Sequence, residues 1–565
     1  MSGSSAEKKR RKVLVIGLDG MCMDVMNALI TEDRLPYLES IIQNGAIGRL
    51  RSTIPPASAP AWVSFMTGMN PGKHGVFDFT KQSTEGFGRR FVSSKDVSAP
   101  TLWSILSDFK KEVGIINVPI TFPPSQVNGF MITGMLTPDV DGEWTYPPSL
   151  KRELTGRDKR YEETFQWQHK DWRRCDGGRA HQYLRDSIDC LARRTEAILY
   201  LMDKFDWDFF AAVFTEPDRI QHALWRYIDP DCSVSEKGRD RGIKVLLDRF
   251  YRSLDDHLGQ ICNRIDSDTT LFIISDHGFG PWYRKMYMNK WLHDQGFLKI
   301  DWGKLYLYKA FRSQGQLLYK ILKLISNVDL RRKFWRKAMG ADRAIAPRTL
   351  YNCIDWTKTK AYFASNTEQG IYINVAGREP RGIVQEGKEY EETRDSIIER
   401  LRQVRDPQTG EKLHSHIFKR EEVYTGPHVN EAPDILFILR DGEYLGVSEL
   451  RNRTFDSEPQ RLGRGIHRID GICAVSGEAI KKGAEFCARI VDLFPTILYQ
   501  MGLPIPEDVD GAVMKAIFND SFLGSHPISY AEALEPVEQP GREQVFSEEQ
   551  SRKLKDRLRG LGYID

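Results

Sequence analysis

Three short apolar segments constrain the fold of this chain more than any other feature of its sequence. They cover residues 13–18, 209–214 and 271–274. Apolar side chains follow one another in these segments without polar alternation, which is typical of strands buried on both faces of a parallel sheet. A polar turn with an aspartate follows each segment, and these aspartates are Asp19, Asp218 and Asp276.

Helical periodicity separates the three predicted strands, at residues 24–44, 184–204 and 242–264. The alternation of strand and helix predicts an α/β sandwich, in which helices cover a mostly parallel central sheet. Functional sites in such sheets lie at the carboxyl ends of the strands. We therefore expect the three aspartates to meet at one edge of the sheet.

The stretch 282–426 differs from the rest and is interpreted as an inserted cap. Residues 304–337 are strongly basic with aliphatic residues at helical spacing, whereas 360–364 and 370–375 have strand patterns. A helix packed on the core with a solvated basic face is favoured here over a peripheral helix on a membrane surface. The predicted parts are core (1–281), cap (282–426), a second core part that begins with a strand near 432–439 (427–535) and a tail helix (536–565).

Composition narrows the functional classes. A formal net charge of +3 over 565 residues gives no reason to expect a nucleic-acid polymer as partner. No apolar run approaches the roughly 20 residues that span a bilayer, and the basic residues 8–12 are interpreted as a solvated lead-in to the first strand. The eight cysteines form no Cys-x-x-Cys pair, which favours free thiols and a cytoplasmic location.

Histidines stand near two of the aspartates at spacings that suit metal binding. Asp218 and His222 share one face of a helical turn, and Asp276 and His277 are adjacent in a glycine-flanked turn. His467 is predicted to lie on a glycine-rich loop. A lone histidine indicates a metal site only if it completes a set of other ligands. Each set of three donors leaves an open position, as a catalytic metal site requires. The two sets are Asp19, Asp276 and His277, and Asp218, His222 and His467.

Ser58 is the candidate nucleophile between these two sets. A serine hydroxyl is a poor nucleophile at neutral pH and needs activation by a base or a metal. No Gly-x-Ser-x-Gly motif surrounds Ser58, so metal coordination is the expected activator. The pair His74-Gly75, later in the same block, is interpreted as structural, because it would fix the turn after the nucleophile's helix.

Five motifs in this order resemble the type I phosphodiesterase/nucleotide pyrophosphatase family of the alkaline-phosphatase superfamily. The resemblance runs from Lys12 to about Gly511 and implies an alkaline-phosphatase-like three-layer α/β/α sandwich with a mostly parallel sheet and an inserted cap. The motifs are Leu18-Asp19-Gly20, the block from Ser58 to Gly75, Glu216-Pro217-Asp218-x-x-x-His222, Ser275-Asp276-His277-Gly278 and Gly465-x-His467.

The resemblance also implies roles for these residues. Ser58 would attack phosphorus and form a covalent phosphoseryl intermediate, which water then hydrolyses. The expected substrate is a small anionic phosphoester, and the expected metals are two zinc ions, with manganese as the alternative. One ion would be held by Asp19, Ser58, Asp276 and His277, and the other by Asp218, His222 and His467.

One departure weakens the nucleotide-specific interpretation. Family members that act on nucleotides carry a phosphate-binding asparagine downstream of the nucleophile, where this chain has Phe79. Asn117 and Lys285 are the candidates to bind a substrate oxygen in its place.

Other activities of the same superfamily stay open at this point. A phosphomonoesterase, or a phosphotransferase of the mutase type, would use much the same metals. A sulfatase is less well supported, because Trp62 stands where the sulfatase motif after Ser58 and Pro60 has arginine. A non-catalytic, ligand-binding member is disfavoured because all six expected ligands and the nucleophile are present.

Overall fold

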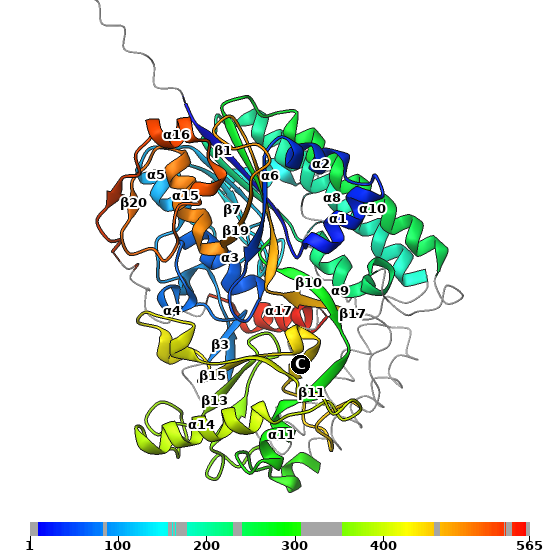
Figure 1. Ribbon diagram of the computed structural model, residues 1–565, viewed down its shortest axis with the longest axis vertical. Coiled ribbons are helices and arrows are strands. Elements are labelled where there is room, and N and C mark those ends of the chain that lie inside the picture. The colour runs from blue at the N-terminus through cyan, green and yellow to red at the C-terminus, as the bar shows by residue number, and fades with distance from the viewer. Residues whose placement is uncertain are drawn as a thin grey trace, which may run out of the picture.

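A nine-stranded sheet runs through the core of the protein, in the order β19-β2-β18-β9-β1-β8-β5-β6-β7 (Figure 1). Only β18 and β7 run antiparallel to their neighbours. The strands are β1 (Lys12–Leu18), β2 (Ala46–Arg51), β5 (Val113–Ile116), β6 (Gly129–Ile132), β7 (Thr145–Tyr146), β8 (Phe209–Phe214), β9 (Thr269–Ile274), β18 (Asp470–Ser476) and β19 (Glu485–Arg489). The three apolar segments are thus confirmed as the central strands β1, β8 and β9.

The computed structural model describes most of the chain. The basic segment predicted to be helical lies outside the described residues from residue 307 onward. The described residues are 10–82, 88–155, 161, 164, 178–229, 240–306, 353–456, 464–535, 537 and 545–560.

The register of the central strands brings the predicted site residues to one edge. β1 pairs in parallel with both β8 and β9, and Gly17 lies opposite Val213 on one side and Ile274 on the other. The chain therefore leaves all three strands at the same level, toward Asp19, Asp218 and Asp276. This confirms the expectation that the carboxyl edge of a mostly parallel sheet gathers the three aspartates.

Helices cover both faces of this sheet, so the α/β/α sandwich is confirmed (Figure 1). The predicted helix 24–44 is in fact two helices, because the backbone leaves the helical conformation at Asp33, which has a φ of +53°, and Pro36 begins the second helix. One face carries α1 (Met23–Thr31), α2 (Pro36–Gln43), α8 (Gly178–Lys204) and α10 (Arg241–Cys262). The other carries α3 (Ser58–Thr67), α5 (Leu102–Asp108), α15 (Leu493–Gln500) and α16 (Asp520–Ser525).

A second, six-stranded sheet forms the lower part of the molecule (Figure 1). Its strands are β11 (Arg284–Tyr287), β12 (Ala361–Phe363), β13 (Gly370–Ile373), β14 (His414–Lys419), β15 (Ile435–Leu439) and β16 (Tyr444–Val447), with α11 (Met288–Asp294) and α14 (Lys388–Arg402) beside them. The placement of the strand near 432–439 in the core was wrong, since β15 pairs with β13, β14 and β16. Its apolar run is buried in a separate small core, which explains the misassignment.

Further helices and strands complete the described part of the chain. They are α4 (Pro71–His74), β3 (Thr80–Gln82), β4 (Arg89–Phe91), α6 (Ser149–Leu154), α9 (Glu216–Ile228), β10 (Gly278–Trp282), β17 (Arg464–Arg468), β20 (Ile505–Pro506) and β21 (Tyr530–Ala531). The tail helix α17 (Glu548–Gly560) lies between the two sheets in Figure 1 and buries Leu554 and Leu558 in the main core.

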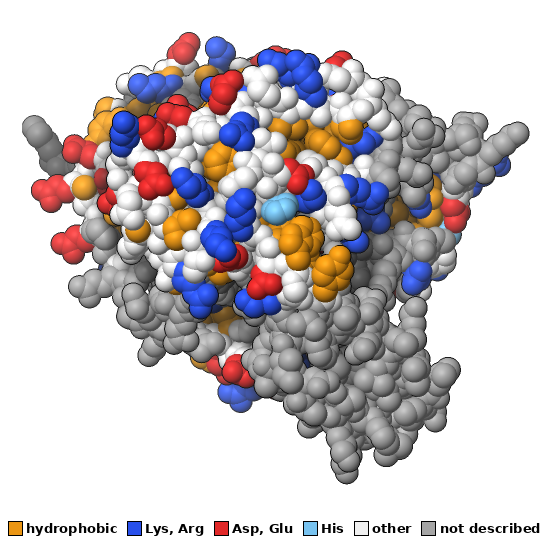
Figure 2. Space-filling view, turned by 90° about the horizontal axis from the view of Figure 1, so that it is seen from below, with side chains coloured by type: hydrophobic (Ala, Val, Ile, Leu, Met, Phe, Trp, Pro, Cys, Tyr) orange, Lys and Arg blue, Asp and Glu red, His pale blue; other side chains and the backbone are white. Residues whose placement is uncertain are grey.

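The surface of the described residues is chemically mixed. Figure 2 shows the lower end of the molecule, where basic and acidic side chains are interspersed with small hydrophobic patches. No helix within the described ranges is long and apolar enough to cross a membrane. The six cysteines that the structure describes are free thiols, as expected from their spacing.

The contact between β1 and the helix α3 gives a stability prediction. A Cβ atom on Gly17 would lie 2.5 Å from Cη2 of Trp62 and 2.9 Å from Cγ2 of Val213. Because this core is close-packed, we expect Gly17→Ala to destabilise the protein by about 1–3 kcal/mol, measured by urea denaturation. Gly524→Ala, where a Cβ would meet open space, is the matched control. Equal midpoints for the two variants would contradict this account of the packing.

Candidate active site

The turn after β1 places Asp19 beside the helix α9. Gly20 has a φ of +71°, and a Cβ there would lie 3.2 Å from Cα of Asp218. Glycine therefore allows the two chain segments to approach closely. The turn is held by the Gly20 N–H, which donates to Asp276 Oδ1 at 3.3 Å, and by Gln221 Nε2, which donates to Gly20 O at 2.9 Å.

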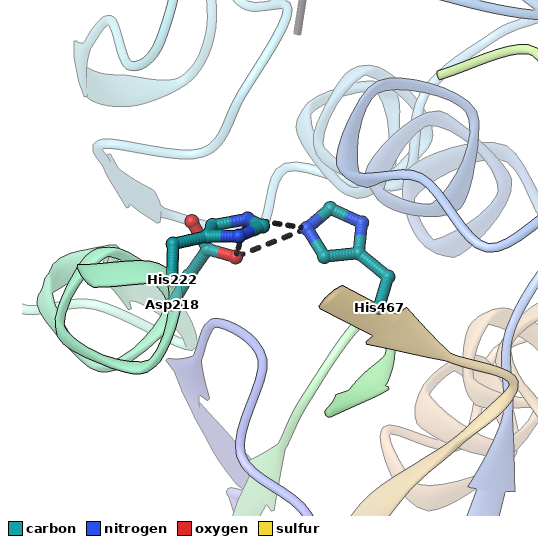
Figure 3. A group of neighbouring side chains, drawn as sticks. All are labelled: Asp218, His222 and His467. Atoms are coloured by element: carbon teal, nitrogen blue, oxygen red, sulfur yellow. Dashed lines mark hydrogen bonds and ion pairs between the residues drawn. The ribbon is translucent and has the colours of Figure 1, made fainter. Parts of the chain in front are cut away.

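Asp218, His222 and His467 face one another (Figure 3). Asp218 Oδ1 lies 3.3 Å from His222 Nε2 and 3.2 Å from His467 Nε2. The two Nε2 atoms are 3.0 Å apart. All three side chains are buried, and they come from α9 and from a strand 245 residues away from His222.

A small antiparallel ribbon brings His467 to this position. The glycine-rich sequence around His467 predicts a loop, but the residue lies on β17, which pairs with β10 so that His467 is opposite Phe279. A glycine at position 465 is typical of a loop. In this strand glycine is required for a different reason, because a Cβ would lie 2.4 Å from the Phe279 ring. The ribbon also stacks the His467 ring on His277, with centroids 3.6 Å apart.

The second nitrogen of each histidine fixes its tautomer. The Nδ1 atoms of His222, His467 and His277 lie 3.0, 3.3 and 3.0 Å from the carbonyl oxygens of Gly465, Pro56 and Gly278. A carbonyl oxygen only accepts hydrogen bonds, so Nδ1 carries the proton in each neutral ring. Each Nε2 therefore presents a lone pair to the site, as metal-binding histidines do.

Ser58 lies next to His277 and at the start of a helix. Its Oγ is 3.1 Å from His277 Nε2, which is itself 3.3 Å from Asp276 Oδ2 and 3.6 Å from Asp19 Oδ1. Ser58 is the first residue of α3, where the free N–H groups and the helix dipole favour negative charge. Both Ser58 and His277 are buried, so an alkoxide at Ser58 would be little solvated by water.

Burial shifts the titration of these groups. It raises the pKa of Asp19 well above the usual value and that of Asp276 to about 7, and it lowers the pKa of His277 well below its usual value. Burial also acts to raise the pKa of Asp218, but His222 and His467 outweigh it and lower that pKa well below the usual range. Strongly shifted groups gathered at one edge are typical of a functional site.

The donor set fits divalent metal ions. Ligand atoms of Asp218, His222 and His467 all lie within 4.8 Å of one another, and so do those of Asp19, Asp218 and His277. Within the described part of the chain, Asp19 Oδ1 and Asp276 Oδ2 are buried and accept no hydrogen bond. Buried lone pairs that converge without donors are costly unless a cation lies among them.

The remaining predicted residues lie as follows. The Asn117 side chain donates to Val213 O at 2.7 Å, and its φ of +59° makes it a turn residue after β5. Lys285 lies on β11 of the second sheet, with Nζ 5.7 Å from the Trp282 ring centroid. Substrate contact by either residue stays a prediction. Phe79, at the position of the family asparagine, is fully buried in the main core.

His74 supports the helix that carries Ser58, as the sequence analysis expected. Its Nδ1 accepts the Val76 N–H at 3.2 Å, so Nε2 donates to Ser64 Oγ at 3.0 Å. Burial lowers the pKa of His74 to about 3, which keeps the ring neutral. Both nitrogens are engaged in these structural bonds rather than turned toward the aspartates.

A model of the type I phosphodiesterase/nucleotide pyrophosphatase family matches residues 13–458. The match covers more than half of the 565 residues. The chain belongs to this family. It is a metal-dependent phosphoester hydrolase of the nucleotide pyrophosphatase/phosphodiesterase type. The matched range ends before His467, so the place of that residue in the site comes from the geometry.

One solved structure with a TM-score above 0.5 shares the fold at low sequence identity, and two others show weaker similarity. Phosphonoacetate hydrolase from Sinorhizobium meliloti 1021, in complex with phosphonoformate, has a TM-score of 0.51 and 14% identity, over 87% of this chain and 95% of that chain. Human ectonucleotide pyrophosphatase/phosphodiesterase 5 has a TM-score of 0.47 and 12% identity, over 91% and 99%. Murine ectonucleotide pyrophosphatase/phosphodiesterase 5, in an inactive form in complex with AMP, has a TM-score of 0.46 and 13% identity, over 87% of this chain and 95% of that chain. No curated protein matches by sequence.

A buried ion pair behind the site was not found from the sequence. Arg194 on α8 donates through Nε and Nη2 to Glu216 Oε1, at 3.2 and 3.1 Å, and the thiol of Cys190 donates to the same oxygen at 3.0 Å. Glu216 is the first residue of α9, the helix that carries Asp218. Glu216 was visible in the motif, but nothing in the sequence of α8 marked Arg194 as its partner.

Removing one partner of this pair tests how much the pair contributes to the stability of the fold. Arg194→Met leaves the Glu216 carboxylate buried without its cation, so we expect a loss of about 3–5 kcal/mol in unfolding free energy, measured by chemical denaturation. The double variant Arg194→Met/Glu216→Leu removes both charges and is expected to recover most of that loss. A single variant as stable as the wild type would show that α9 does not depend on the pair.

Proposed function

We propose that the enzyme hydrolyses small phosphodiesters by nucleophilic attack of Ser58, at a site that holds two divalent metal ions. The observation that carries this proposal is the position of Ser58 Oγ, 3.1 Å from His277 Nε2, at the N-terminus of α3. The hydroxyl thus lies among converging acceptors and at the positive end of a helix. The helix N-terminus favours an anion at this place, and cations bound by the converging acceptors would stabilise both the alkoxide and an anionic phosphoester.

The residues divide into two ligand sets in this proposal. Bound there, two cations supply Lewis-acid stabilisation of the serine alkoxide and of the leaving oxygen. Imidazole nitrogens with carboxylate oxygens suit zinc, with manganese as the alternative. One set is Asp19, Ser58, Asp276 and His277, and the other is Asp218, His222 and His467. Ligand atoms of Asp218 lie within 4.8 Å of those of His222 and His467, and also within 4.8 Å of those of Asp19 and His277, which supports two adjoining ligand sets.

The reaction proceeds through the serine itself. Ser58 Oγ loses its proton to solvent and attacks phosphorus. The bond from phosphorus to the leaving oxygen breaks on the opposite side, and the leaving oxygen takes a proton from solvent to become the alcohol. The product of this step is a phosphoseryl ester. A water molecule then attacks the same phosphorus and breaks its bond to Ser58 Oγ, which regenerates the enzyme. Two in-line displacements give net retention of configuration at phosphorus.

Removing the hydroxyl is the direct test of the nucleophile. We expect Ser58→Ala to lower hydrolysis of bis-p-nitrophenyl phosphate at least about a thousandfold, because the covalent route is closed. The assay uses zinc- or manganese-loaded protein and includes p-nitrophenyl phosphate and p-nitrophenyl sulfate. Ser64→Ala, further along α3, is the control, because the Ser64 hydroxyl is hydrogen-bonded to His74 rather than to His277.

Each substrate in this assay distinguishes the proposed phosphodiesterase from one alternative activity. A preference for the monoester would move the assignment to a phosphatase or phosphotransferase, and a preference for the sulfate ester would move it to a sulfatase. Diester turnover that survives in Ser58→Ala would contradict the nucleophile. Diester turnover that survives complete removal of metal by a chelator would contradict the metal site.

Metal binding gives a test that does not depend on turnover. Because buried acceptors converge at this edge, a cation that binds the folded protein stabilises it, by about 2.7 kcal/mol at a free concentration a hundred times Kd. We expect a chelator to lower the thermal unfolding temperature and zinc to restore it. Asp218→Asn should weaken the response to zinc most, since Asp218 lies near both sets. An unfolding temperature unaffected by chelator and by zinc would count against the ligand assignment.

A further inference from the structure

The segment just before Ser58 is held almost entirely through its carbonyl groups. Pro55 and Pro56 have no backbone N–H, so this stretch offers few donors for hydrogen bonds. Thr53 Oγ1 donates to Pro55 O at 3.1 Å, and the Ala61 N–H donates to Ala57 O at 3.1 Å. These two bonds are local to the segment and to the first turn of α3.

The other two carbonyls of this run are held from far along the chain. His467 Nδ1 donates to Pro56 O at 3.3 Å, and the Tyr424 hydroxyl donates to Ile54 O at 2.5 Å. Four successive carbonyls, from residue 54 to residue 57, therefore each accept a hydrogen bond. One of the two distant donors belongs to the candidate metal site, and the other belongs to the part of the chain that forms the second sheet.

Tyr424 is itself firmly placed at the junction of the two sheets. Its side chain is buried, and its ring lies 5.3 Å from the Phe77 ring, centroid to centroid. The residues that follow it dock on the chain after α3, since Thr425 N–H donates to Asn70 Oδ1 at 3.1 Å and His428 N–H donates to Gly72 O at 2.9 Å. Burial raises the pKa of the Tyr424 hydroxyl, so the group stays a donor.

We propose that Tyr424 is a positioning residue for Ser58, which couples the placement of the second sheet to the geometry of the nucleophile. Tyr424 does not touch the reacting atoms. It fixes the carbonyl four residues before the nucleophile, and the proline-rich stretch between them transmits that position to the start of α3. The catalytic part of this inference rests on the proposed function of Ser58.

The variant Tyr424→Phe removes one hydroxyl and keeps the ring that packs on Phe77. Misplacing a nucleophile by a fraction of an ångström lowers the rate of the chemical step, so we expect kcat for bis-p-nitrophenyl phosphate to fall about tenfold or more. KM and the zinc affinity are expected to stay within about twofold, because the substrate contacts and metal ligands are unchanged.

Tyr499→Phe is the matched control. Tyr499 also donates its hydroxyl to a backbone carbonyl, His526 O at 2.7 Å, but on α15 of the core rather than beside the nucleophile. A kcat for Tyr424→Phe within twofold of the wild type, or an equal fall in both variants, would overturn the positioning role. A fall in kcat that is matched by a fall in zinc affinity would also overturn it.

Hydrogen exchange separates this inference from the proposed function. Exchange of the backbone amides of residues 52–59, followed by mass spectrometry, is expected to be faster in Tyr424→Phe and unchanged in Tyr499→Phe. A wild type that hydrolyses none of the esters would contradict the proposed function, and exchange alone would then decide whether Tyr424 orders the segment. Unchanged exchange in Tyr424→Phe would overturn the inference whatever the activity.

Discussion

The structure depends on a cluster of buried acceptors at the carboxyl edge of the central sheet. Three histidines have their proton on Nδ1, held by backbone carbonyls, so that three Nε2 lone pairs face three aspartates. Such a cluster is unfavourable by itself, because buried acceptors without donors or cations repel one another. The fold therefore maintains an arrangement that a bound cation would stabilise, and Ser58 lies within it.

Several independent elements hold this cluster together. The parallel register of β1, β8 and β9 brings the three aspartates to the same edge of the sheet. The β10–β17 ribbon adds His467, which lies far along the chain from the other ligands. The buried pair of Arg194 and Glu216 supports the first turn of α9 from behind. The Tyr424 hydroxyl, from the part of the chain that forms the second sheet, donates to Ile54 O in the segment before the nucleophile. The segment before the nucleophile is thus in contact with both parts of the molecule.

Much of this arrangement could be predicted from the sequence. The apolar runs that end at Asp19, Asp218 and Asp276 predict the central strands and their common edge, because burial on both faces leaves a clear pattern. His467 on a strand and the strand Ile435–Leu439 in the second sheet could not be predicted, since pairing partners leave no local signal. The roles of Arg194 and Tyr424 could not be predicted for the same reason, because each acts through contact with a residue that is distant in the chain.

The most direct test of this account is the anomalous diffraction of a crystal of the zinc-loaded protein. We predict two anomalous peaks on either side of Ser58, one among Asp218, His222 and His467 and one among Asp19, Asp276 and His277. A crystal with zinc bound only at other places, and none among these residues, would contradict the central claim that the buried acceptors form a metal site around the nucleophile.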